Sequence, residues 1–89
     1  MFNAEIKVKE ALASALNFSD ISTIESNHHL KKDLQLDSMS SLMFLMKLEE
    51  SIHGFIVDPE TLQMKDLETV SSIVKYVNLQ LLTKEHHVH

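Results

Sequence analysis

Residues 37–52 read DSMSSLMFLMKLEESI, and their pattern is the most informative in the chain. Asp37 is a residue type that accepts hydrogen bonds from the free backbone N–H groups at a helix start. Gly54 follows closely, and glycine is the residue type that most often ends helices. These signals predict a helix that begins at Asp37-Ser38 and runs to about Ser51 or Ile52.

This predicted helix is apolar on two faces when it is plotted at about 100 degrees per residue. One side carries Phe44, Leu45, Leu48 and Ile52, and roughly the opposite side carries Met39, Leu42, Met43 and Met46. A helix of this kind is central in the core of a larger protein, but a bundle of this size is too small to cover both sides. We therefore assign the first set to the core.

The second set is predicted to face partner proteins, with Glu49 and Glu50 at its edge. Methionine adapts to differently shaped surfaces, which suits a protein that binds several partners. The alternative, in which these methionines belong to the core, stays open at this stage.

Three further helices are predicted around this one. Apolar residues at spacings of three and four indicate a helix over residues 2–16, and a long loop pinned by apolar residues follows over 17–37. Asp58-Pro59-Glu60 is a strong helix start and predicts a short helix over about 59–64. Thr69 is expected to cap a last helix that ends near Leu82.

The composition agrees with an all-α fold. The chain has 89 residues, which suffices for one domain, and it contains one glycine and one proline, which argues against a strand-and-turn architecture. We expect a four-helix bundle with a long loop between its first two helices and a short third helix. The predicted domain covers residues 1–82, and residues 83–89 are predicted to form a flexible tail.

The net charge and the residue usage indicate which classes of partner and site to expect. The net charge of −5 disfavours nucleic acid and anionic membranes and favours basic protein surfaces. The chain has no cysteine, so disulfides and thiolate sites are excluded. No secretory signal pattern or run of about 20 apolar residues is present, so we expect a cytoplasmic monomer.

Ser38 lies where a long polar segment meets the first turn of a helix. A phosphate joined to its hydroxyl would meet free backbone N–H groups and the positive end of the helix dipole. The alternative is that Asp37 and Ser38 do no more than cap the helix, since serine is common near helix starts.

Several segments resemble the acyl carrier protein family. Residues 33–39, DLQLDSM, resemble the signature Asp-Leu-Gly-x-Asp-Ser-Leu of that family, and LEE at 48–50 resembles the end of the helix that follows. FIVD at 55–58, together with Thr69-Val70 and Tyr76-Val77, is similar to the later segments of the family. The similarity covers about residues 2–80.

The resemblance implies that Ser38 receives 4'-phosphopantetheine from coenzyme A through a phosphopantetheinyl transferase. The thiol of the cofactor would then hold an acyl or aminoacyl thioester for the enzymes that load and use it, either inside the bundle or outside it. It also implies that Asp37 helps the transferase, with magnesium, although a pure capping role is equally open. Chemistry would belong to the cofactor and the partners, so we expect no enzyme activity. The alternative function is an unmodified interaction module.

The chain departs from the family pattern at three positions. Gln35 stands where glycine is usual, and Ser40 and Met43 stand where carriers of primary fatty acid synthesis often have acids. The segment over residues 58–69 is also longer than in those carriers. A specialised pathway, such as one that makes polyketides or peptides, is therefore as compatible with the sequence as fatty acid synthesis.

The histidines are not expected to bind a metal. His28-His29 and the histidines at 86, 87 and 89 lie on segments predicted to be mobile, without suitably spaced acidic partners. We predict solvated side chains there. Lys31-Lys32 is likewise predicted to be a solvated charge pair.

Overall fold

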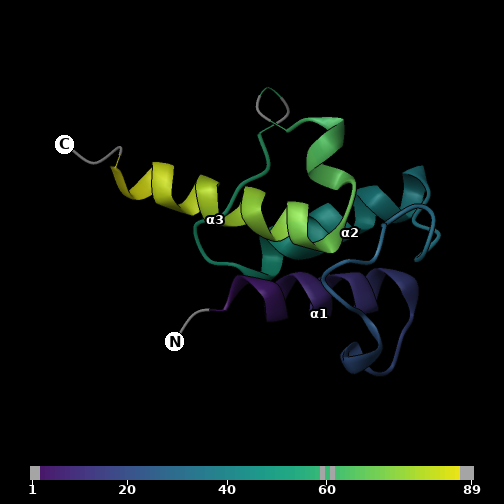
Figure 1. The fold of residues 1–89 in the computed structure, drawn as a ribbon. Helices are drawn as coiled ribbons and strands as arrows, with labels where there is room; N and C mark the ends of the chain where they lie inside the picture. Colours follow the sequence, from purple (N-terminus) through teal and green to yellow (C-terminus); the bar gives the residue numbers. More distant parts are fainter. Residues whose placement is uncertain (1–2, 59, 61, 87–89) are drawn as a thin grey trace.

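The computed structural model describes residues 3–58, 60 and 62–86. It contains three α-helices, α1 (Ala4–Leu16), α2 (Ser38–Ser51) and α3 (Val70–His86), as Figure 1 shows. Two short 3-10 helices, η1 (Ile21–Thr23) and η2 (Met64–Leu67), lie in the connections. The described residues form no β-strand, so the predicted all-helical class is confirmed.

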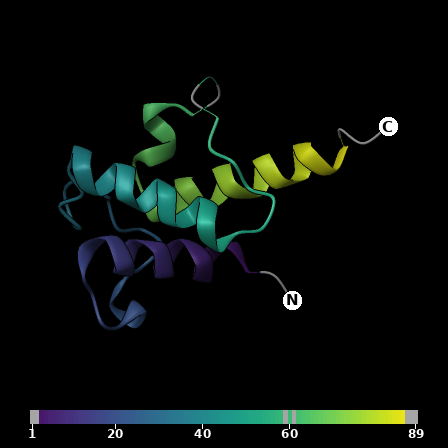
Figure 2. The same ribbon diagram turned by 180° about the vertical axis from the view of Figure 1, so that it is seen from behind.

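The helix α1 holds the bundle together because it packs against both α2 and α3, while η2 packs against α3 (Figures 1 and 2). The Cα atoms of α2 and α3 stay more than 8 Å apart. The space between the helices is filled by fully buried side chains, among them Val8, Leu12, Phe44, Leu48, Ile73 and Val77.

Side chains and backbone geometry set the two ends of α1. The Asn3 side chain accepts hydrogen bonds from the N–H groups of Glu5 (3.0 Å) and Ile6 (3.3 Å). Asn17 ends the helix in the left-handed region, with φ 63°, a conformation that asparagine tolerates better than most residues. The predicted helix is thus confirmed over Ala4–Leu16, and the predicted start at residue 2 lies outside the described residues.

The two faces predicted for α2 are both present. Phe44, Leu48 and Ile52 are buried and Leu45 is half-buried against them. The side chains of Met39, Leu42, Met43 and Met46 are exposed, with exposed fractions between 45% and 71%. The three methionines therefore do not belong to the core.

The segment between α1 and α2 is more ordered than the long loop that the sequence predicts. It contains η1 and is tied to the start of α3, because Leu30 N–H donates to Glu68 C=O (2.9 Å) and Val70 N–H donates to His28 C=O (3.1 Å). Ile24, Leu30, Leu34 and Leu36 are buried. These apolar side chains explain why the segment folds onto the helices.

The prediction of a helix over 59–64 is wrong. In the described part of that segment, the Asp58 carboxylate accepts from Glu60 N–H (3.0 Å) and Asp58 C=O accepts from Leu62 N–H (2.9 Å), which closes one turn. Residues 59 and 61 lie outside the described residues. The next helical turns begin only at Met64 and are of the 3-10 type. Of the predicted four-helix bundle, only the all-helical class is therefore confirmed.

The helix α3 is longer than predicted, since it continues past Leu82 to His86. Figures 1 and 2 show its C-terminal half extending beyond the other helices. The flexibility predicted for residues 83–89 stays a prediction, and 87–89 lie outside the described residues. Within the described residues, no helix combines the length and the apolar character that crossing a membrane requires.

Candidate attachment site

Ser38 is the first residue of α2, and its side chain is exposed to solvent. Asp37 precedes it as the N-cap, and the Asp37 carboxylate accepts a hydrogen bond from Ser40 N–H at 2.8 Å. Ser41 N–H donates to Asp37 C=O, also at 2.8 Å. The Ser38 hydroxyl therefore sits at the positive end of a well-capped helix, where a phosphate group is stabilised.

The cap also affects the charge of Asp37. The hydrogen bonds that Ser40 donates, first from its backbone and then from its side chain, lower the pKa of the Asp37 carboxyl below its usual value. Asp37 is therefore ionised at neutral pH. This carboxylate belongs to the residue directly before Ser38.

The residue Gln35, three positions before Ser38, has a left-handed backbone with φ 56°. The neighbours of Gln35 impose this conformation, since Leu34 and Leu36 are both buried and Leu36 N–H donates to Leu30 C=O (2.9 Å). A residue with a side chain is strained in this region, whereas glycine is not. Gln35 therefore has a backbone conformation that favours glycine, the residue type that is usual at this position in the family.

The predicted partner-binding residues share an exposed surface on α2, although one of them has a second role. Glu49 and Glu50 are exposed, as are the methionines and Leu42. The Glu49 carboxylate also accepts a hydrogen bond from Val57 N–H (2.8 Å). Glu49 thus fastens the segment after α2, which no pattern in the sequence indicated.

A cavity of about 280 Å³ opens next to the first turns of α2. Leu36 and Ser41 line it from the α2 side, and Met64 and Leu67 line it from η2. Sequence reasoning missed Met64 and Leu67, because they approach α2 only through the placement of η2. The cavity lies one helical turn away from Ser38, since Ser41 is three residues further along the helix.

Two histidines of the predicted set, His28 and His29, have structural contacts. His28 Nδ1 accepts from Glu25 N–H (3.0 Å), and His29 Nδ1 accepts from Lys32 N–H (3.2 Å). Both imidazoles therefore stabilise turns in the segment before α2. Across the described residues, no three His, Asp or Glu side chains lie close enough to hold a metal ion.

Comparison with known proteins agrees with this geometry. The family described as "Phosphopantetheine attachment site" matches residues 7–77. Acyl carrier proteins of the Aster yellows witches'-broom phytoplasma and the Onion yellows phytoplasma are each 38% identical to the chain over 71 residues. Each match covers 80% of this chain and 88% of the relative. The chain belongs to the acyl carrier protein family.

The residues present fit the phosphopantetheine group of this family. An exposed hydroxyl stands at a helix N-terminus, where backbone N–H groups and the helix dipole favour a phosphate. The cavity beside α2, which leucines and Met64 line together with polar side chains, lies within one helical turn of that hydroxyl. The chain has no cysteine, and the terminal thiol of the cofactor supplies the sulfur that thioester chemistry requires.

Proposed function

We propose that Ser38 carries 4'-phosphopantetheine, and that the protein delivers acyl or aminoacyl groups as thioesters on this arm. The observation that carries the proposal is the exposed Ser38 hydroxyl on the first turn of α2, directly after the Asp37 cap. The family membership supports the cofactor, and the helix terminus supports the position. The reactions that load and use the thioester belong to partner enzymes.

Asp37 has two roles in this proposal. Its carboxylate keeps Ser40 N–H bonded and so holds the first turn of α2 in place. The same ionised group lies where it can assist a phosphopantetheinyl transferase and its magnesium ion during transfer of the arm from coenzyme A.

The exposed surface of α2 is the proposed docking site for the transferase and for the acyl-loading and acyl-using enzymes. It consists of Met39, Leu42, Met43 and Met46, with Glu49 and Glu50 at its edge. Apolar side chains this exposed on one helix face are typical of a surface that partners cover. The lack of acids at Ser40 and Met43 favours partners of a specialised pathway over those of primary fatty acid synthesis.

Docking is tested by Met43→Glu. Because Met43 is exposed, the variant is expected to keep its helicity and its Ser38 modification while binding cognate enzymes more weakly. Circular dichroism and binding titrations with a purified partner enzyme measure both properties. Loss of folding in this variant would contradict the assignment of Met43 to the docking surface.

The attachment site is tested by intact mass. The protein is incubated with coenzyme A, magnesium and a promiscuous phosphopantetheinyl transferase, beside Ser38→Ala and the matched variants Ser40→Ala and Ser41→Ala. We expect a gain of one phosphopantetheine in the parent and in both matched variants, and no gain in Ser38→Ala. A gain that persists in Ser38→Ala would move the attachment site to another residue.

The exposed methionines also favour a second function, an unmodified module that binds a partner helix or groove through α2. The same mass experiment separates the two functions. Absence of any gain with several transferases would support the module and overturn the carrier proposal.

A further inference from the structure

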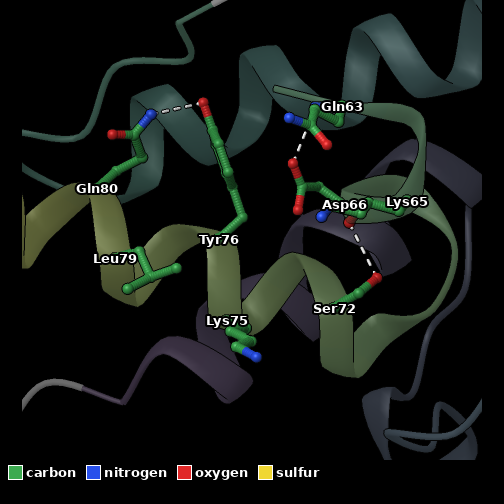
Figure 3. Close-up of a pocket in the computed structure, with 8 residues that line it drawn as sticks. All are labelled: Gln63, Lys65, Asp66, Ser72, Lys75, Tyr76, Leu79 and Gln80. Atoms are coloured by element: carbon green, nitrogen blue, oxygen red, sulfur yellow. Dashed lines mark hydrogen bonds between the residues drawn. The ribbon is translucent and has the colours of Figure 1, made fainter. Parts of the chain in front are cut away.

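A second cavity lies between η2 and α3 (Figure 3). It has a volume of about 600 Å³ and is lined by Lys65 and Asp66 from η2 and by Lys75, Tyr76 and Leu79 from α3. Lys65 also lines the cavity beside α2, whereas Lys75, Tyr76 and Leu79 belong neither to the exposed surface of α2 nor to the attachment site.

Internal hydrogen bonds hold the walls of this groove in place. The Asp66 carboxylate accepts from Gln63 N–H (2.8 Å), and Ser72 Oγ donates to Asp66 C=O (3.0 Å). Gln80 Nε2 donates to the Tyr76 hydroxyl at 2.7 Å, a bond that is drawn in Figure 3. The groove is therefore formed before any ligand arrives, which lowers the entropy cost of binding.

Two lysines and one acid line the groove, and neither lysine forms an ion pair with a described residue. In the described part of the chain the one ion pair joins Lys9 to Glu5, so the ammonium groups of Lys65 and Lys75 are both unpaired. Asp66 is the single acidic residue in the lining. An excess of positive charge here is notable because the whole chain has a net charge of −5.

An apolar side chain lies next to these lysines. Leu79 is 53% exposed and lines the groove, and Leu82, one turn further along α3, is also exposed. This is the part of α3 that extends beyond the other helices (Figures 1 and 2). The groove therefore offers one apolar contact with cationic groups beside it.

We propose that this groove binds an acidic segment of a partner protein. Carboxylates of the segment pair with Lys65 and Lys75, and an apolar side chain of the segment packs against Leu79. The proposal goes beyond the carrier function, because it needs neither a modified Ser38 nor the exposed surface of α2. A basic groove favours acidic partners, whereas the acidic edge of α2 favours basic ones.

The experiment uses the full chain with Ser38→Ala, so its outcome does not depend on the attachment proposal. A short blocked peptide of Glu, Leu and Ala is titrated into ¹⁵N-labelled protein, and the affinity is measured by fluorescence anisotropy with a dye-labelled copy. We expect saturable shifts at the amides of Lys65, Lys75 and Leu79. A matched peptide with Lys in place of Glu is expected to cause none.

Charge-reversal variants sharpen the test. Lys65→Glu combined with Lys75→Glu is expected to weaken binding of the acidic peptide about tenfold. Lys32→Glu is the control, because Lys32 is an exposed lysine that lines neither cavity, and it is expected to change the affinity less than about twofold. Lys32, Lys65 and Lys75 are all exposed, so these variants are expected to fold.

Three outcomes would overturn the proposal. The first is no saturable shift, and the second is equal binding of the acidic and basic peptides, which would indicate apolar association alone. The third is a set of groove shifts that grow with protein concentration in the absence of peptide, which would make a second copy of the chain the occupant.

Discussion

The segments on the two sides of α2 are fastened in different ways. The segment before α2 is held by backbone hydrogen bonds, such as the one from Leu30 N–H to Glu68 C=O (2.9 Å), and by buried leucines. In the described part of the segment after α2, side chains also bond the backbone, since Val57 N–H donates to the Glu49 carboxylate and Asp58 N–H donates to the Tyr76 hydroxyl (3.2 Å).

The difference indicates which of the two segments is held more rigidly. Backbone bonds together with a buried core position the segment that leads directly to Ser38, so removal of one of its buried side chains strongly destabilises the protein. The segment after α2 depends also on single side-chain hydrogen bonds, and loss of one such bond has a smaller, local effect.

The largest effect is expected from Leu30→Ala. Leu30 is fully buried, so the variant leaves a cavity in the core and is expected to lower the free energy of unfolding by about 3 kcal/mol. The matched change in the other segment, Leu62→Ala, removes a half-buried side chain and is expected to cost about 1 kcal/mol. Urea unfolding measures both. Equal costs would contradict the difference between the segments.

Tyr76→Phe is expected to loosen only the segment after α2. The variant loses the hydroxyl that bonds Asp58 and Gln80, and the expected cost is about 1 kcal/mol. Hydrogen exchange is expected to accelerate at the Asp58 amide, because its acceptor is gone. The Leu30 amide serves as the control, and a comparable acceleration there would show that the two segments open together.

Gln35→Gly is expected to stabilise the protein by about 0.5 kcal/mol, because relief of the left-handed strain exceeds the entropy cost of glycine. The control is Gln63→Gly, where φ is −113° and glycine relieves nothing, so that variant is expected to be less stable than the parent. Thermal unfolding of both variants checks the sign. A destabilised Gln35→Gly would show that the Gln35 side chain makes a compensating contact.

The smallest effect concerns pH and Asp37. The hydrogen bonds from Ser40 lower the pKa of Asp37 in the folded state, so its contribution to stability is complete above the unfolded pKa and is lost as pH falls through the folded pKa. Asp37→Asn keeps a capping oxygen but does not titrate. The parent is expected to be more stable than the variant at neutral pH, with the difference vanishing in acid.

Urea midpoints measured at several pH values test this prediction. A difference between the parent and Asp37→Asn that does not change with pH would mean that the carboxylate contributes only as a neutral hydrogen-bond acceptor would. The same substitution at Asp20, the cap of η1 whose pKa is also lowered, is expected to show the same trend in the segment before α2.

The helix α2 and its two faces were predictable because helical periodicity is a local property. Phe44 and Leu48 lie one turn apart and are both buried, and the methionines on the other side are exposed. The helix start at Asp37 was predictable for the same reason, since a capping side chain acts within three residues.

The helix predicted over 59–64 failed although its start signal was strong. The Asp58 cap is present but closes a single turn, and the next helical turns begin at Met64, where the Asp66 carboxylate accepts from Gln63 N–H. Contacts with α3 decide this outcome, because Tyr76 holds Asp58 and Ser72 holds Asp66. A start signal in the sequence does not report how far the helix continues when such tertiary contacts compete with it.

Local patterns in the sequence predict the all-helical class, the extent of α2 and its two apolar faces. The serine at the start of α2 and the resemblance to carrier proteins are also visible in the sequence. These features depend on residues within a few positions of one another, where backbone geometry dictates the neighbours. Only the tertiary structure decided the left-handed backbone at Gln35, the role of Glu49 and the groove that joins Lys65 to Lys75. Each of these depends on burial or contacts that reach beyond one helical turn, and local propensity carries no information about which residues meet there.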